Sequence, residues 1–242
     1  MCKLYLFDGY EHLSEEFIAR SLAFLPADRR IRALRYRRRI DRWNCVVAYL
    51  MLLYGLRECF GITTFKIAFG EYGKPYLPEY PQVHFNISHC DTGCAVAVAD
   101  CHVGVDIQDV RPFSWDMARR VCCEQEITEL EERADQNELF TEMWTMKESY
   151  GKMIGMGLLY ELQSDCCEKE RSAYIQTVRV NGKSCKLASK SLTPFLYVNR
   201  LGCQRPQICG GRHPTIFSID GVDTNDFMVR ACLKNKYCTS RK

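Results

Sequence analysis

The chain has 242 residues, of which 47% are hydrophobic and 26% charged, with a net charge of +3; this composition is typical of a globular protein and excludes disorder as the main state. Its length suits one large domain or two small ones. The longest apolar run, Cys45 to Leu56, is shorter than the roughly 20 residues of a membrane-spanning helix, and the N-terminus shows no signal-peptide pattern, so we expect a cytoplasmic protein without a membrane segment.

The residue pattern predicts strands and helices in mixed order. Ser14 is expected to cap a helix, Pro26 to open the next one and Gly155 to end a long one. Helices are expected over residues 14–24, 41–58, 114–120, 123–132 and 138–153, and strands over 2–7, 65–68, 84–89, 94–99, 103–110, 173–180, 214–219 and 226–233. Residues 181–213 are interpreted as irregular. Without clean βαβ alternation, this order favours an α+β fold.

Cysteine is frequent, with fifteen residues in the chain. Several lie within apolar runs, including Cys45, Cys94, Cys101 and Cys232, which indicates reduced, buried side chains. The alternative is a structural zinc site, but this would require paired C-x-x-C spacing, which the chain does not offer.

Positive charge is concentrated in one segment. Eight arginines lie between Arg29 and Arg42 against one acid, Asp41, and the rest of the chain has 25 basic and 29 acidic residues. This segment suits contact with phosphate, on a small molecule or a nucleic acid. A solvated helix face is the alternative.

Two acidic motifs suggest a metal site. On a strand through 104–108, Asp106 and Gln108 share one face, opposite Val105 and Ile107. A carboxylate among apolar residues needs a partner or a cation, and a second oxygen beside it suits a hard metal ion. The alternative is an edge strand facing solvent.

The second motif lies on a helix, where Trp144, Glu148 and Lys152 form one stripe. The alternative for this stripe is a surface ion pair beside a buried tryptophan. A third motif, residues 84–89, ends with Ser88 and His89, which are suited to a phosphate; a turn-capping serine and a solvated histidine are the alternative there.

The motifs G-K-P, F-N-I-S-H, G-V-D-I-Q and W-x-x-K-E-S, with a lysine four residues after the glutamate, occur in this order. The combination resembles the Sfp-type 4′-phosphopantetheinyl transferases, which move the phosphopantetheine arm of coenzyme A to a serine of a carrier protein. The resemblance runs from Leu25 to Gly157, more loosely from Met1, and returns in the final hairpin.

The resemblance implies a role for each matching residue. Asp106 and Glu148 match the Mg²⁺ ligands, and Lys152 matches the catalytic lysine that faces the coenzyme A phosphates. The resemblance further implies that Gly73, Lys74 and Pro75 line the adenine of coenzyme A. It implies that Ser88 and His89 contact the phosphates, with His89 at the 3′-phosphate. Arg29 and Arg32 match basic residues that also bind the 3′-phosphate. Glu148, directly or through a metal-bound water, is the expected general base.

The family's fold implies two similar α+β halves about a pseudo-twofold axis, with the site between them. The halves would be residues 1–102, on the adenine and 3′-phosphate side, and residues 103–242, on the metal-binding side. The implied partners are coenzyme A and an apo acyl or peptidyl carrier protein, with no membrane and no nucleic acid, and the implied state is a monomer.

Gln108 departs from the family pattern, because many members carry glutamate there. Glutamine keeps one ligand oxygen but loses a negative charge. We therefore expect Gln108 to be at most a weak or water-mediated ligand; direct coordination by its carbonyl oxygen is the alternative.

Two other functions remain open from the residues. Asp106, Gln108, Glu148 and Lys152 also fit a Mg²⁺-dependent nuclease. The arginine-rich segment also fits a non-catalytic nucleic-acid-binding protein. The nuclease does not account for the G-K-P motif or for the Ser-His pair, whereas Tyr36 and Trp43, near the arginines, give slight support to the nucleic-acid-binding protein.

Overall fold

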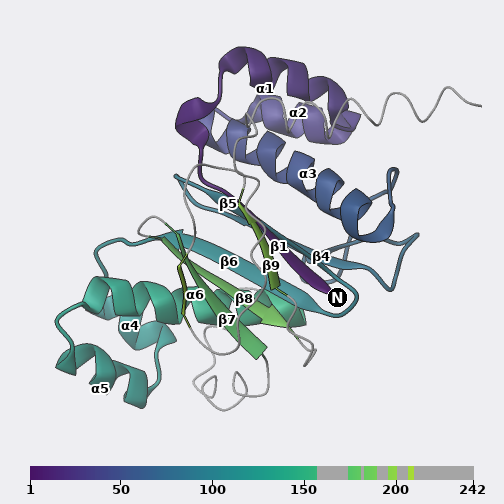
Figure 1. Ribbon diagram of the computed structural model, residues 1–242. Coiled ribbons are helices and arrows are strands. Elements are labelled where there is room, and N and C mark those ends of the chain that lie inside the picture. The colour runs from purple at the N-terminus through teal and green to yellow at the C-terminus, as the bar shows by residue number, and fades with distance from the viewer. Residues whose placement is uncertain (157–173, 181–182, 190–195, 201–206, 210–242) are drawn as a thin grey trace, which may run out of the picture.

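The computed structural model describes residues 1–156, 174–180, 183–189, 196–200 and 207–209 as a mixed α+β chain (Figure 1). The helices are α1 (Glu15–Ser21), α2 (Ala27–Arg35), α3 (Arg39–Phe60), α4 (Trp115–Val121), α5 (Glu124–Glu132) and α6 (Gln136–Ile154), with 3₁₀ turns at Tyr10–His12 and Leu22–Phe24. The strands are β1 (Cys2–Phe7), β2 (Ala68–Phe69), β3 (Pro75–Tyr76), β4 (His84–His89), β5 (Cys94–Ala99), β6 (Val103–Asp109), β7 (Tyr174–Val180), β8 (Lys183–Ser189), β9 (Leu196–Arg200) and β10 (Gln207–Cys209).

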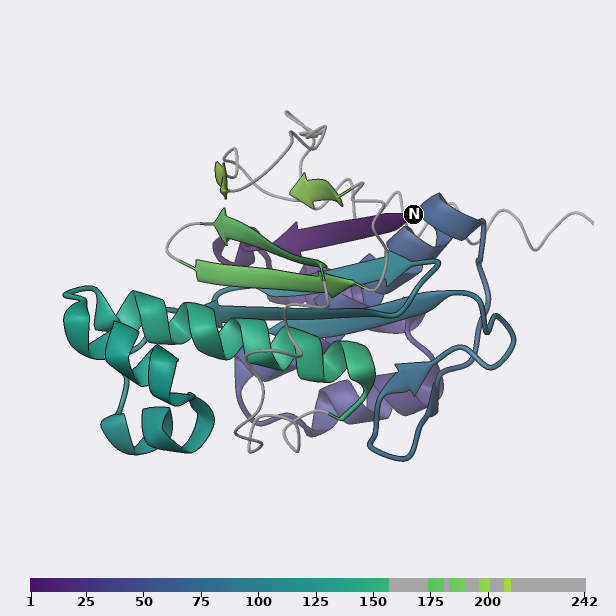
Figure 2. The same cartoon turned by 90° about the horizontal axis from the view of Figure 1, so that it is seen from below.

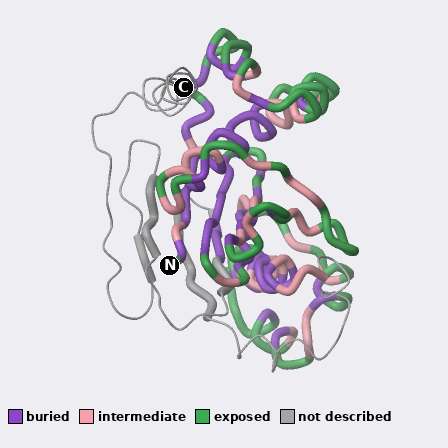
Figure 3. The backbone as a smooth tube through the Cα atoms, turned by 90° about the vertical axis from the view of Figure 1, so that its right-hand side faces the viewer, coloured by how far each residue is buried: buried purple, intermediate pink, exposed green. Residues whose placement is uncertain are grey.

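Two four-stranded sheets form the centre, in the orders β4-β5-β1-β9 and β10-β7-β8-β6. On β1, Tyr5 and Phe7 belong to the core under α3, whereas Leu4 and Leu6 belong to the core shared with Val105 of β6. The period-2 alternation of strand side chains thus builds both cores from one strand. Helix α6 runs along the second sheet (Figure 2). Buried residues concentrate in β1, β4, β5, β6 and α3, whereas α2, α5 and the turns are mostly exposed (Figure 3).

Most predicted elements are confirmed between residues 1 and 156. Ser14 caps α1, where its Oγ accepts a hydrogen bond from the Phe17 amide at 3.0 Å. Gly155 ends α6 in the left-handed region at φ 86°, as the sequence predicted. Among the described residues, no helix is long and apolar enough to span a membrane.

The prediction of an irregular segment over residues 181–213 is wrong, because β8, β9 and β10 lie within it. Strand β8 pairs antiparallel with both β6 and β7, and β9 pairs parallel with β1 at the opposite end of the chain. These pairings depend on distant partners, which local composition does not reveal. The predicted strands 214–219 and 226–233 lie outside the described residues, and the pseudo-twofold halves stay a prediction.

The expected strand over residues 65–68 is reduced to the two-residue strand β2. It pairs with β3, so that Ala68 lies opposite Tyr76 and Phe69 opposite Pro75. The turn that joins them includes Gly73, whose φ of 78° favours glycine. The segment is therefore a short hairpin rather than a strand of either large sheet.

Side chains of β4 join the two sheets where their edge strands meet. Asn86 Oδ1 accepts a hydrogen bond from the Val105 amide at 2.9 Å, and Ser88 Oγ accepts one from the Ile107 amide at 3.3 Å. Both side chains are buried. Because a buried, unpaired amide is costly, these two acceptors stabilise the edge of β6 against β4.

Helix α6 crosses β6 at Gly104 with no room for a side chain. A Cβ atom at this position would lie 2.0 Å from the Ser149 carbonyl oxygen and 2.4 Å from the Met153 amide nitrogen. Both of these atoms belong to the helix backbone, which cannot yield locally as a flexible side chain would. Glycine at position 104 is therefore a condition for the close packing of α6 on β6.

Gly104→Ala should destabilise the protein because the new methyl group forces α6 away from β6. Overpacking of this kind costs about 1–3 kcal/mol, and thermal or denaturant unfolding measures it. Gly70→Ala is the matched control, since its Cβ would meet only the Lys74 carbonyl oxygen, at 3.7 Å. Equal stability of Gly104→Ala and the wild type would contradict the close packing.

Candidate active site

Asp106 is the centre of the polar cluster between β4, β6 and α6. Its carboxylate is 1% exposed. Oδ1 accepts hydrogen bonds from Ser88 Oγ at 2.6 Å and from Lys152 Nζ at 2.5 Å, and Oδ2 accepts one from Gln108 Nε2 at 3.0 Å. The predicted face sharing of Asp106 and Gln108 is thus confirmed, and three donors stabilise the buried negative charge.

Helix α6 adds a second carboxylate to this cluster. Glu148 Oε2 lies 3.8 Å from Lys152 Nζ, one helical turn away, and the Glu148 side chain is 13% exposed. Lys152 therefore contacts both acids. Trp144, the third member of the predicted stripe, packs instead against Phe140, with ring centroids 6.3 Å apart, in the core near α4 and α5.

The donor set around Lys152 suits a hard divalent cation. Two carboxylates converge on one positive group, and Mg²⁺ is commonly held by one or two protein carboxylates together with phosphate oxygens and water. Within the described part of the chain, no group of three or more His, Cys, Asp or Glu side chains converges. Asp106 and Glu148 could hold such a cation, while the Gln108 amide group is turned with its N–H toward Asp106.

His89 lies at the end of β4 beside this cluster. The residue is exposed, but the protein packed around its imidazole lowers its pKa below the ordinary value, and the charges of Lys152 and Arg32 lower it further, against the opposite effects of Asp41 and Asp106. Arg32 and Lys152 are therefore close enough to His89 for their fields to act on it. An anion placed among these three groups would be stabilised.

The two predicted phosphate-binding arginines have different surroundings. Arg32 Nε donates a hydrogen bond to the Tyr36 hydroxyl at 3.2 Å, which raises the pKa of the guanidinium. Arg29 lies over the Tyr49 ring, 5.4 Å from its centroid, and its Nη1 is 3.9 Å from Cys45 Sγ. The structure thus ties Arg29 to α3 and leaves Arg32 within range of His89.

The hairpin that contains Gly73, Lys74 and Pro75 reaches the end of α6. Lys74 Nζ donates hydrogen bonds to the carbonyl oxygens of Met153, at 2.6 Å, and Val103, at 3.2 Å. A lysine is favourable there because the last carbonyls of a helix carry partial negative charge. This contact holds the hairpin next to the turn of α6 that presents Lys152.

Comparison with known proteins identifies relatives of this chain. Residues 102–199 match the 4′-phosphopantetheinyl transferase superfamily. The chain is 32% identical over 149 residues to a 4′-phosphopantetheinyl transferase of Bacillus subtilis, covering 60% of this chain and 66% of that protein. It is 32% identical to the transferase ffp of Bacillus subtilis and 30% identical to Sfp of Bacillus subtilis strain 168, each over 156 residues, 63% of this chain and 70% of the relative.

The chain belongs to the 4′-phosphopantetheinyl transferase superfamily. The resemblance recognised from the four motifs is confirmed, and so is the identification of the chain as an enzyme of this class. The roles of the individual residues in this transferase stay predictions.

The sequence analysis assigned no role to Lys147, whose side chain is buried in the structure. It is 1% exposed, and its Nζ lies 3.0 Å from Glu126 Oε2. The same oxygen accepts a hydrogen bond from the Cys123 amide, so this ion pair ties the start of α5 to α6. The spacing of Phe140, Met143 and Lys147 along one helix face would have indicated a buried lysine.

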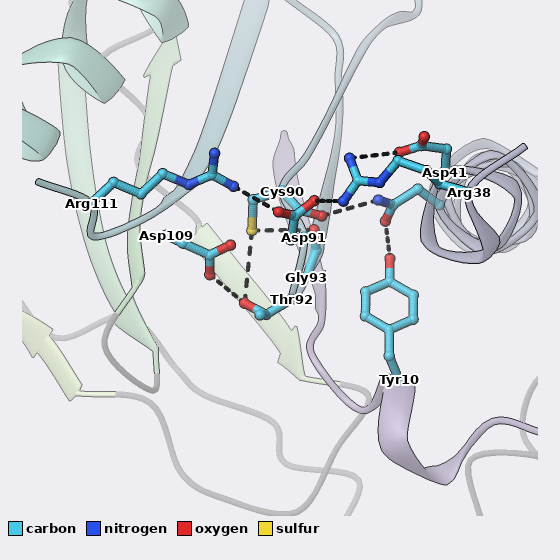
Figure 4. A network of polar contacts seen from close by, with 10 residues as sticks. Tyr10, Arg38, Asp41, Cys90, Asp91, Thr92, Gly93, Asp109 and Arg111 are labelled. Carbon is cyan, nitrogen blue, oxygen red and sulfur yellow. Dashed lines mark hydrogen bonds and ion pairs between the residues drawn. The ribbon is translucent and has the colours of Figure 1, made fainter. Parts of the chain in front are cut away.

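An ion-pair network fixes the turn that follows His89 (Figure 4). Asp91 accepts hydrogen bonds from Arg38 Nη2 at 2.9 Å and from Arg111 Nη2 at 2.8 Å. Arg38 precedes α3 and Arg111 follows β6, so one carboxylate joins these two segments across the turn. Single exposed ion pairs contribute little stability, but two arginines on one carboxylate restrict the turn's position.

Other arginines of the basic segment also contact the protein itself. Arg42 Nη2 lies 3.3 Å from Glu15 Oε2, and Arg39 lies over the Trp43 ring, 4.8 Å from its centroid. These contacts give part of the arginine-rich segment a structural role between α1 and α3. They weaken the interpretation of the segment as a free nucleic-acid-binding surface.

The described cysteines are free thiols, in agreement with the interpretation of reduced side chains. Cys45 and Cys94 are buried, Cys101 is partly buried, and Cys232 lies outside the described residues. Burial raises the pKa of Cys94 to about 12, which keeps it protonated and unreactive.

An NMR pH titration should give His89 a pKa below the ordinary 6.5 in the free protein. The imidazole is then neutral at pH 7 and gains its proton only as the pH falls through this lowered pKa. A phosphate bound beside the imidazole would raise the pKa, because it stabilises the imidazolium. His89→Gln assigns the signal, and a pKa at or above 6.5 in the free protein would contradict the described surroundings.

Proposed function

We propose that the protein transfers the 4′-phosphopantetheine arm of coenzyme A to a serine of an apo acyl or peptidyl carrier protein, in a Mg²⁺-dependent reaction that releases 3′,5′-ADP. The observation that carries the proposal is the convergence of Ser88, Asp106, Glu148 and Lys152 in one cluster. The motifs that contain these residues are far apart in sequence. Their convergence supports a shared site in a member of this family.

The reaction requires negative charge to be neutralised as a phosphoanhydride bond breaks. The carrier serine oxygen forms a bond to the β-phosphorus of coenzyme A, and the bond from that phosphorus to the bridging oxygen breaks, so that 3′,5′-ADP leaves. Asp106 and Glu148 would hold the Mg²⁺ that supplies charge stabilisation when bound. Lys152 would add a positive point charge at the phosphates, and Glu148 would accept the serine proton, directly or through a metal-bound water.

The rest of coenzyme A would be bound by the surrounding elements. His89 and Arg32 would bind the 3′-phosphate, with Arg29 as a further candidate; the positive charge of Arg32 already lowers the pKa of the His89 imidazole, after the larger effect of burial. Ser88 points at Asp106, so it would orient that carboxylate as well as contact a phosphate. The hairpin of Gly73, Lys74 and Pro75 would line the adenine. The hydrogen bond from Lys74 to the Met153 carbonyl oxygen holds this hairpin beside the end of α6.

The proposed site draws on both predicted halves. Ser88 and His89 belong to residues 1–102, whereas Asp106, Glu148 and Lys152 belong to residues 103–242. Because one chain supplies both groups, this arrangement supports a monomer as the active unit. We propose no nucleic acid or membrane as a partner.

Transfer is tested by incubating the protein with Mg²⁺, fluorescent coenzyme A and a panel of apo carrier proteins at equal concentration. Glu148→Ala should reduce labelling on the order of 10²-fold or more, as loss of a metal ligand or electrostatic group commonly does. Glu138→Ala is the control, since this acid lies exposed in the first turn of the same helix.

Two outcomes would contradict the proposal at different points. More than about half of the activity in folded Glu148→Ala would remove Glu148 from the site. No labelling of any carrier by the wild type, alongside Mg²⁺-dependent DNA cleavage, would replace the proposal with the nuclease.

His89→Ala should raise the KM for coenzyme A more than the KM for 3′-dephospho-coenzyme A, because only the first substrate carries the phosphate that His89 would bind. The comparison uses both substrates with the wild type and with the variant. His84→Ala is the matched control, since His84 begins the same strand and stacks on His102 with ring centroids 4.4 Å apart. An equal loss for both substrates would show that His89 acts elsewhere.

A further inference from the structure

The oxygens of Asp106 are already engaged by the protein's own donors. Oδ1 accepts from Ser88 and Lys152, Oδ2 accepts from Gln108, and the carboxylate is 1% exposed. Two of these donors are neutral groups, which a bound cation can tolerate nearby. The third donor is the positively charged ammonium group of Lys152, whose Nζ lies 2.5 Å from Asp106 Oδ1.

Lys152 therefore has the position and charge that a metal ion on these carboxylates would require. Its ammonium group contacts Asp106 Oδ1 and lies 3.8 Å from Glu148 Oε2. A divalent cation on the same oxygens would meet this positive charge within a few ångströms, and such repulsion is strong in a partly buried site. The lysine and the metal cannot both occupy their best positions on Asp106.

Lys152 is able to move if another anion receives it. Its side chain is 24% exposed, whereas that of Asp106 is 1% exposed, so solvent reaches part of the lysine side chain but not the carboxylate. A lysine has a flexible stem and three donors, which suit it to exchange one oxygen partner for another. The pyrophosphate of the substrate offers such oxygens and also brings its own ligands for the metal.

We infer that Lys152 is a built-in counter-cation of the Asp106–Glu148 pair, which weakens divalent metal binding until a pyrophosphate group draws the ammonium away. The inference rests on the proposed function, because it takes the same two carboxylates as the metal ligands. Metal and coenzyme A then bind cooperatively, and each strengthens the other by the same factor. Gln108 and Ser88 keep Asp106 oriented during the exchange.

The test measures Mn²⁺ binding directly, by the electron paramagnetic resonance signal of free Mn²⁺, without any transfer reaction. Lys152→Met should bind Mn²⁺ more tightly than the wild type in the absence of coenzyme A, by about 5- to 150-fold, the usual range of such couplings. Saturating coenzyme A should tighten Mn²⁺ binding in the wild type by a larger factor than in Lys152→Met. Lys152→Gln should behave as Lys152→Met does, and Lys152→Arg as the wild type.

Lys186→Met is the matched control for the loss of one positive charge. Lys186 lies directly opposite Asp106 on β8, is buried, and has its Nζ 3.7 Å from Glu142 Oε2. Its removal takes away one buried positive charge near Asp106 together with the contact to Glu142. Thermal unfolding of each variant confirms that the compared proteins are folded.

Equal Mn²⁺ affinity in the wild type, Lys152→Met and Lys152→Gln would overturn the inference, as would an equal gain in Lys186→Met. In either case, loss of binding in Asp106→Asn would show that the metal site of the proposed function still stands. No Mn²⁺ binding in any variant, with or without coenzyme A, would overturn both the inference and the proposed metal site.

Discussion

The close approach of α6 to β6 at Gly104 is the constraint on which the site depends. The helix backbone occupies the space that any side chain would take, with Ser149 O 2.0 Å from a hypothetical Cβ. Asp106 lies two residues further along the same face of β6. The close approach of the helix therefore determines how near Lys152 and Glu148 of α6 lie to the Asp106 carboxylate. A packing requirement at one glycine thereby determines the geometry of three charged groups.

The sheet that contains β4 contributes through polar side chains at its edge. Asn86 and Ser88 on β4 accept hydrogen bonds from the backbone of β6, where apolar side chains would leave amides unpaired. Ser88 also donates to Asp106, so the same residue closes the sheet edge and orients the carboxylate. The F-N-I-S-H motif therefore has a structural reason for its residues in addition to the phosphate contact proposed for it.

Charge balance connects this architecture with the chemistry. A buried carboxylate is stable only with partners, and the protein supplies Lys152 together with neutral donors. Burial lowers the pKa of His89 at the rim of the cluster, and the same lysine lowers it further, together with Arg32. The groups proposed to bind the 3′-phosphate and the pyrophosphate therefore lie close enough to influence one another before a substrate arrives.

The sequence by itself determined most elements of residues 1–156, because hydrophobic periodicity, Ser14 and Gly155 are local signals. Its motifs also determined the family and the central group of Asp106, Glu148 and Lys152. Only the tertiary structure decided that the Gln108 N–H faces Asp106, that Lys147 pairs with Glu126, and that β8 to β10 lie in a segment interpreted as irregular. These features depend on contacts between distant residues, whose energies are absent from any local stretch of the chain.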